Sequence, residues 1–199
     1  MVLSGVYKTF MNRWEGFQTA WIISDLHFGE DDLKRAFPNR PSDDELVRRI
    51  NAKCGRKDIL FVLGDCGDLE YVKKLRGYKV LIMGNHDTGA TKYEEVFDEV
   101  YEGALIIGEK LILSHEPIAM IPWAFNFHGH NHAQKKNAPG HMNVCADVLG
   151  YVPAHLNSLL NGGITSKVYT IHRETIDNAT DRKKKRGGKK IGEKEGIKR

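Results

Sequence analysis

The sequence contains 199 residues, of which 41% are hydrophobic and 28% are charged, and its formal net charge is +4. This length and apolar fraction indicate one folded domain of ordinary size and exclude a chain that is disordered throughout. Charged side chains interrupt the apolar residues near the N-terminus, and no apolar run approaches the length of a membrane span. We therefore expect no signal peptide, no membrane partner and a cytoplasmic location.

The three cysteines, Cys54, Cys66 and Cys145, are widely spaced and include no CxxC pair. This pattern indicates neither a disulfide framework nor a zinc ribbon. We expect free thiols in a reducing compartment.

Strands and helices are predicted to alternate along most of the chain. Apolar runs rich in β-branched residues predict strands at residues 19–24, 59–64, 79–84, 110–115, 143–148 and 167–172. Helices are predicted at residues 42–54, 68–77, 92–100 and 153–162, the clearest of which begins at Ser42 with Glu45 completing a capping box. Most of the strands are continuously apolar, which indicates burial on both faces. The alternation predicts a layered α/β domain, and the hairpin-like spacing of residues 104–115 adds an antiparallel pair.

Basic residues are concentrated at the C-terminus. Residues 182–199 hold ten Lys or Arg and two Glu, a net charge of +8, so residues 1–181 carry −4. We predict a single domain over residues 1–180 and a basic, disordered tail over residues 181–199. The acidic body argues against a broad cationic nucleic-acid groove. The tail is a candidate for binding polyanions, for a nuclear address in a eukaryotic source, or for solubility alone.

Polar side chains follow the predicted strands at the points where these end. The residues concerned are Asp25 and His27, Asp65 and Asp68, Asn85, His86 and Asp87, and His115, and the stretch FHGHNH adds His128, His130 and His132. Ligands of layered α/β proteins bind at the carboxyl ends of strands, so these groups are expected to converge. Mixed Asp, His and Asn ligands suit Mn, Fe or Zn, and seven ligands exceed the four of one structural zinc. Two ions that share a carboxylate, as in phosphate-ester hydrolases, would use all seven.

Five ordered blocks in this sequence resemble those of the calcineurin-like metallophosphoesterases, in particular small bacterial and phage members. The blocks are Asp25-Leu26-His27, Gly64-Asp65, Gly84-Asn85-His86-Asp87, Ser114-His115 and Gly129-His130-Asn131-His132. The resemblance covers residues 20–155, and the segments Asn39-Arg40-Pro41 and MNVCADVLGYVP are similar as well. It implies two facing mixed β-sheets flanked by helices.

The resemblance also implies roles for polar residues of these blocks. It assigns Asp25, His27 and His132 to one divalent ion, Asn85, His115 and His130 to the other, and Asp65 to both. Mn²⁺ is the favoured metal, with Fe, Zn, Ni and Mg as alternatives. His86 has no ion to bind in this scheme, and we expect it to donate a proton to the leaving oxygen or a hydrogen bond to the phosphate. Asn85, His86 and Arg40 are the candidate phosphate contacts.

Several neighbouring residues allow more than one interpretation. Asp68 is interpreted as a helix cap rather than a ligand, and Asp87 as a carboxylate that orients a histidine. His128 is either a supporting residue or part of the pocket wall, Arg40 either a phosphate contact or an ordinary surface residue, and Trp123 and Phe125 line the mouth or the core. Cys66 is expected to be a packed thiol. Glu30 stands where relatives with a similar opening often carry a histidine, and His141, His155 and His172 are expected to be ordinary surface or helix residues.

The sequence thus predicts a phosphodiesterase that attacks its substrate directly with a hydroxide bridging two metal ions. The preference for diesters, with nucleotides and cyclic nucleotides among the candidates, follows from the resemblance alone. The nearest alternative is a phosphomonoesterase acting on nucleic-acid ends or phosphoproteins. A non-catalytic scaffold and a nucleic-acid-binding protein that works through its tail are the alternatives from other classes. The sequence does not indicate an oligomeric state.

Overall fold

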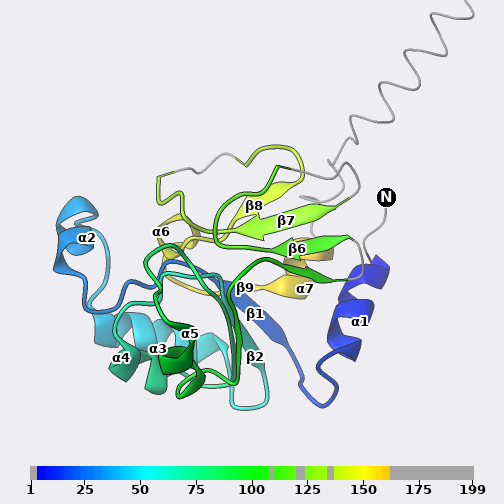
Figure 1. Cartoon of the computed structure of the whole chain (residues 1–199), viewed down its shortest axis with the longest axis horizontal. Coiled ribbons are helices and arrows are strands. Elements are labelled where there is room, and N and C mark those ends of the chain that lie inside the picture. The colour runs from blue at the N-terminus through cyan, green and yellow to red at the C-terminus, as the bar shows by residue number, and fades with distance from the viewer. Residues whose placement is uncertain (1–3, 108–109, 120–123, 134–136, 162–199) are drawn as a thin grey trace, which may run out of the picture. The chain divides into compact units, whose positions relative to one another are not determined.

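Two mixed β-sheets form the framework of the protein in the computed structural model, which describes residues 4–107, 110–119, 124–133 and 137–161. The larger sheet has the order β4-β3-β2-β1-β9, and the smaller has the order β5-β6-β7-β8 (Figure 1). The strands are β1 (Ala20–Ile23), β2 (Ile59–Val62), β3 (Tyr78–Ile82), β4 (Glu99–Tyr101), β5 (Leu105–Ile107), β6 (Leu111–Leu113), β7 (Phe125–His128), β8 (His141–Asn143) and β9 (Ala154–His155). Only the β1–β9 and β5–β6 pairs are antiparallel among these strands. The predicted α/β fold of two mixed sheets is confirmed.

Helices flank the sheets. They are α1 (Ser4–Asn12), α2 (Asp31–Ala36), α3 (Asp43–Lys53), α4 (Leu69–Lys73), α5 (Ala90–Glu94), α6 (Ala146–Leu149) and α7 (Leu156–Asn161). In Figure 1, α3, α4 and α5 lie together beside the larger sheet, and α1 and α7 lie near its other side. None of the helices in the described ranges is long and apolar enough to cross a membrane.

The central strands β1, β2 and β3 of the larger sheet divide their buried side chains between two apolar cores. Ile22 and Phe61 point into the core shared with the smaller sheet, α1 and α7, whereas Ile23 and Leu60 point into the core shared with α3, α4 and α5. Neighbouring residues separate in this way because side chains alternate across a strand. Every residue of β2 is buried, which confirms the expectation drawn from its continuous apolar run.

Phe61 joins the central sheet to the N-terminal helix and tests how far that packing stabilises the fold. Its ring is fully buried, with its centroid 5.1 Å from that of Phe10 and 5.0 Å from that of Trp14. We expect Phe61→Ala to lower the free energy of unfolding by about 3–5 kcal/mol, because it leaves a cavity that the two rings cannot fill. Urea denaturation measures the loss. Ile106→Ala, at an exposed position on β5, is the control, and an equal change in both variants would contradict this account of the core.

The clearest predicted helix is confirmed with one difference at its cap. The Ser42 hydroxyl accepts a hydrogen bond from the Glu45 amide at 3.4 Å, as a capping residue should. The Glu45 carboxylate does not return to Ser42 in the manner of a capping box, because it pairs instead with Arg48 and Arg49 at 2.6 and 2.8 Å.

Three element predictions are wrong near the edges of the sheets. The strand predicted at residues 143–148 ends at Asn143, and α6 follows at Ala146. The helix predicted at residues 92–100 ends at Glu94, and residues 99–101 form β4 because they pair with β3. The helix predicted from Pro153 starts only at Leu156, since residues 154–155 pair with β1. In the last two cases pairing with a distant strand overrides a local helical pattern, whereas in the first the predicted strand gives way to a helix.

The two ends of the chain compare differently with the predictions. Helix α1 was not among the predicted elements, although Phe10 and Trp14 from this region enter the core. The strand predicted at residues 167–172, the domain boundary at residue 180 and the basic tail all lie outside the described residues.

Candidate metal centre

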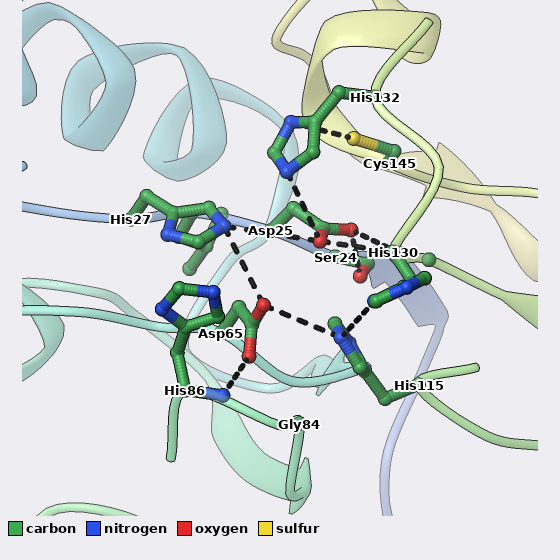
Figure 2. A network of polar contacts seen from close by, with 12 residues as sticks. Ser24, Asp25, His27, Asp65, Gly84, His86, His115, His130, His132 and Cys145 are labelled. Carbon is green, nitrogen blue, oxygen red and sulfur yellow. Dashed lines mark hydrogen bonds and ion pairs between the residues drawn. The ribbon is translucent and has the colours of Figure 1, made fainter. Parts of the chain in front are cut away.

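The seven predicted ligands come from loops that follow the carboxyl ends of five parallel strands. Asp25 and His27 follow β1, Asp65 follows β2, Asn85 follows β3, His115 follows β6, and His130 and His132 follow β7. Ser24 forms a parallel bridge with Cys145, so the end of β1 lies beside the chain that leaves β8. Figure 2 shows His27, Asp25, Asp65, His115, His130 and His132 directed toward one another from these separate segments.

The backbone at four of these ligands is in the left-handed region. The φ angles are 58° at Asp25, 43° at His27, 53° at Asp65 and 67° at His130, and among the described non-glycine residues only Tyr151 is also positive. Such a conformation costs on the order of 1–3 kcal/mol per residue and persists only where the surroundings enforce it. Loops that turn sharply after each strand therefore aim these side chains back across the strand ends.

The first group of candidate ligand atoms lies around His27 Nε2 and Asp25 Oδ1. His27 Nε2 lies 3.9 Å from Asp25 Oδ1 and 3.6 Å from Asp65 Oδ2, and His132 Nε2 lies 3.6 Å from Asp25 Oδ1. The Asp25 carboxylate is fixed by the Ser24 hydroxyl and by the His130 amide, which donates to its two oxygens at 3.1 and 3.0 Å. These separations are those of atoms that face a common point rather than one another.

The second group is closer together. His115 Nε2 lies 2.8 Å from Asn85 Oδ1, and His130 Nδ1 lies 3.0 Å from the same oxygen and 3.2 Å from His115 Nε2. His115 Nδ1 donates to the Leu63 carbonyl at 2.8 Å, which leaves Nε2 as the nitrogen that faces the group.

Asp65 links the two groups through a single oxygen. Its Oδ2 lies 3.6 Å from His27 Nε2 in the first group and 3.3 Å from His115 Nε2 in the second. Its other oxygen, Oδ1, accepts a hydrogen bond from the His86 amide at 2.9 Å. The carboxylate is held in place by the backbone on one side and offers its free oxygen to both groups on the other.

The electrostatics of the cluster favour a positive charge between its carboxylates. Burial acts to lower the pKa of His115, but its contact with Asp65 and its hydrogen bond to Leu63 outweigh burial and raise the pKa to about 9. Burial acts to raise the pKa of Asp65, and the contacts with His115 and the His86 amide outweigh it, so this pKa is lowered. Asp65 thus stays ionised and holds a proton on His115, where a cation would serve the same purpose.

Three observations indicate that these residues fit divalent metal ions. The buried His27 Nε2 has no hydrogen-bond partner, as expected of a nitrogen whose lone pair coordinates an ion. Asp25, His27 and Asp65 each offer one ligand atom, and these atoms lie within 4.8 Å of one another. Carboxylate, imidazole and amide donors are the set preferred by Mn, Fe and Zn. His132 and Asp25 form a similar group with the buried Cys145, a neighbour that the sequence did not single out.

Two glycines allow the ligand loops to approach so closely. A Cβ atom at Gly129 would overlap Ser24 Oγ and Asp25 Oδ2, and a Cβ atom at Gly84 would overlap Asp65 Oδ1. Figure 2 shows Gly84 beside Asp65 and His86. Only a residue without a side chain fits at these two points.

Asp147 supports the site and was not identified from the sequence as a functional residue. Its Oδ2 accepts from His132 Nδ1 at 2.7 Å and from Arg40 at 2.8 Å, and its Oδ1 accepts from the Tyr151 hydroxyl at 2.8 Å. Burial acts to raise the pKa of Asp147, and the bonds from His132 and Arg40 outweigh it and lower the pKa to about 2. A carboxylate behind an imidazole orients the ring for metal binding. The only signal in the sequence was the segment MNVCADVLGYVP, in which Asp147 lies.

Arg40 lies beneath the site. Its side chain is 1% exposed, one terminal nitrogen pairs with Asp147, and the other donates to the carbonyls of Asp25 and Leu26. Arg40 is therefore not an ordinary surface residue, which was one of the two interpretations of the sequence. In these contacts the guanidinium connects the loop after β1 to Asp147. They favour a structural role for Arg40 over a phosphate contact, which was the other interpretation.

The acidic residues next to the ligands have structural tasks. Asp68 caps α4 by accepting from the Glu70 amide at 2.9 Å, as predicted. Asp87 is buried and accepts hydrogen bonds from the amides of Asp65 at 2.8 Å and Gly84 at 2.9 Å. It therefore supports the ligand loops through their backbone, whereas the sequence predicted that it orients a histidine. The buried Cys66 thiol lies 3.4 Å from Asp87, in agreement with a packed thiol.

The remaining predicted residues lie around the cluster. His86 is exposed, and its ring centroid is 5.3 Å from that of His27. His128 is buried in β7 and Phe125 is buried in the core, whereas Trp123 and His172 lie outside the described residues. His141 begins β8 and His155 ends β9, so neither lies in a helix.

Comparisons with known proteins identify a family and a solved structure of similar fold. The model of the family described as calcineurin-like phosphoesterase matches residues 19–188. No curated protein matches the chain. A solved structure of a protein of unknown function from Aquifex aeolicus is 24% identical, covering 71% of this chain and 97% of its own, and is similar in fold with a TM-score of 0.61. The nuclease MPE of Pseudomonas putida is 20% identical, covering 57% of this chain and 60% of its own, with a TM-score of 0.33. The family match spans most of the sequence, and the chain therefore belongs to the calcineurin-like phosphoesterase family.

Proposed function

We propose that the protein is a phosphodiesterase that uses two divalent metal ions, with Mn²⁺ as the first candidate. Asp25, His27 and His132 would hold one ion, Asn85, His115 and His130 the other, and Asp65 both. Family membership supports the hydrolysis of a phosphate ester. The preference for a diester, of which nucleotides and cyclic nucleotides are candidate sources, is the part of the proposal that rests on resemblance.

The observation that carries the proposal is the position of Asp65 Oδ2 between two imidazole nitrogens, 3.6 Å from His27 and 3.3 Å from His115. A site for one ion would not need two separate groups of ligand atoms on either side of one oxygen. A carboxylate in this position is suited to hold two cations close together, the arrangement that serves in-line displacement at phosphorus.

Residues of this chain would orient the substrate and supply a proton. When bound, the pair of ions would supply a hydroxide nucleophile near neutral pH and positive charge for the phosphate oxygens. The amide of His86 is fixed on Asp65 Oδ1, and its imidazole is exposed beside His27. From this position the ring would donate to the oxygen of the leaving group, and Asn85 would donate to a phosphate oxygen through its amide nitrogen.

His86→Ala is expected to lower kcat by about 10²- to 10⁴-fold, the range for removing a general acid. The content of bound metal should not change, because His86 is not among the ligands. Steady-state kinetics and elemental analysis measure the two effects. His155→Ala, a histidine on β9, is the matched control and should turn over normally. Normal turnover in His86→Ala would remove His86 from the reaction.

The substrate class is tested by comparing two chromogenic esters on protein loaded with Mn²⁺. We expect a higher kcat/KM for bis-p-nitrophenyl phosphate, a diester, than for p-nitrophenyl phosphate, a monoester. The reverse order would replace the proposal with a phosphomonoesterase. If metal-loaded protein hydrolyses neither ester nor any nucleotide diester, the chain is better explained as a scaffold on this fold.

A further inference from the structure

Glu30 lies directly beside His27, at the start of α2. Its Oε2 is 2.8 Å from His27 Nδ1, and its side chain is 37% exposed. Glu30 occupies the capping position of α2, but its side chain makes no capping hydrogen bond there. The carboxylate therefore does not cap the helix. Its described polar contact is with the imidazole of His27, a predicted metal ligand.

A tight turn brings Glu30 back onto His27. The Glu30 amide donates to the His27 carbonyl at 3.3 Å, and Gly29 between them has a φ of 80°. The Gly29 amide donates to the buried carboxylate of Asp43 at 3.2 Å, which ties the turn to α3. The position of Glu30 is thus enforced by the backbone of the turn.

The contact with Glu30 determines which nitrogen of His27 carries the proton. An ionised carboxylate only accepts hydrogen bonds, so Nδ1 must be the donor and Nε2 keeps its lone pair. The opposite tautomer would gain nothing at Nε2, whose nearest carboxylate oxygens lie 3.6 and 3.9 Å away, beyond hydrogen-bonding distance. This choice explains why Nε2 is buried without a partner: it faces Asp25 and Asp65 as a ligand atom.

The second group of ligands is supported differently. His115 Nδ1 donates to the main-chain carbonyl of Leu63, which fixes the same tautomer without adding a charge. Glu30 adds a negative charge behind His27, which makes the imidazole a stronger donor to a cation. The effect of Glu30 should therefore be confined to the ion held by His27.

We infer that Glu30 is a positioning residue of the metal centre, which holds His27 in the Nδ1–H tautomer and strengthens the binding of one of the two ions. The inference rests on the proposed function for its metal ions.

The test compares three variants of the full-length protein in two measurements. Mn²⁺ affinity is measured by calorimetric titration, and the tautomer of His27 is read from ¹⁵N chemical shifts of the imidazole in metal-free protein. Glu30→Ala should weaken one binding step by about 10- to 100-fold and leave the other unchanged, the range observed when such outer carboxylates are removed. It should also shift the metal-free His27 toward the Nε2–H form. Glu30→Gln retains a hydrogen-bond acceptor and should restore the tautomer and part of the affinity.

Asp32→Ala is the matched control, because it removes a carboxylate from α2 that is paired only with Arg35 among the described contacts. A long-range charge effect would weaken Mn²⁺ binding equally in Asp32→Ala and Glu30→Ala, and this result would overturn the inference. Unchanged affinity and an unchanged His27 tautomer in Glu30→Ala would overturn it as well. If the ion binds and depends on Glu30 but no phosphate ester is hydrolysed, the proposed function fails while the role of Glu30 stands.

Discussion

Asp65→Asn is expected to reduce kcat/KM by about 10³-fold or more and to lower the metal content from two ions to at most one. The substitution keeps the shape of the side chain but removes the charge that faces both His27 and His115. Charge stabilisation by a metal ion is worth several kcal/mol in the transition state, and each 1.4 kcal/mol corresponds to a factor of ten. Steady-state kinetics and elemental analysis of the same preparation measure the two losses together.

Asp68→Asn provides a matched control for Asp65→Asn. Asp68 lies three residues further along the same loop and serves as the cap of α4, a position that asparagine fills equally well. We expect this variant to bind metal and turn over like the wild type. If Asp65→Asn kept both ions and most of its activity, Asp65 would not be the shared ligand, and the two groups of side chains would require another explanation.

Gly129→Ala is expected to disrupt the site as severely as Asp65→Asn, although it adds only one methyl group. The new Cβ would overlap Ser24 Oγ and Asp25 Oδ2, so either the loop after β7 or the Asp25 carboxylate must move. Such overpacking typically costs about 1–3 kcal/mol. The displacement would also separate His130 from Asp25, whose oxygens accept from the His130 amide. The midpoint temperature of thermal unfolding and the metal content should both fall.

Gly103→Ala is the corresponding control, because a Cβ at Gly103 meets no atom within 4 Å. We expect its stability and metal content to match those of the wild type. Full metal occupancy in Gly129→Ala would show that the close approach of the two loops is not required for the site.

Strands β1, β2, β3 and β6, and the convergence of the candidate ligands at the strand ends, could be predicted from the sequence because both depend on local patterns. The continuous apolar runs identified β1, β2, β3 and β6, and the polar residues after them marked the strand ends where the side chains converge. The five blocks then suggested which ion each ligand would hold. The resemblance was essential at this step, since spacing alone does not pair Asp25 with His132 across more than a hundred residues of chain.

The supporting residues could not be predicted, because their contacts join distant segments. Arg40 and Asp147 meet at 2.8 Å although 107 positions separate them, and neither segment carries a local signal of the pairing. The contact of Asp87 with the amides of Asp65 and Gly84 depends on how two loops meet. Left-handed backbone at Asp25 and Asp65 is likewise set by tertiary contacts and has no sequence signature beyond the tolerance of aspartate for that region.

The incorrect elements have a similar cause. Residues 143–148 are apolar enough for a strand, but Cys145 pairs with Ser24 only through an isolated bridge, and the chain then turns into α6. This turn places Asp147 behind His132, so the departure from the predicted strand contributes to the site.

Crystals of the protein loaded with Mn²⁺ would test the central claim most directly, through anomalous diffraction at the manganese edge. The account predicts two anomalous peaks about 3.5–4 Å apart. One should lie among Asp25, His27 and His132, the other among Asn85, His115 and His130, with Asp65 in contact with both. A single peak, or peaks outside this cluster, would contradict it.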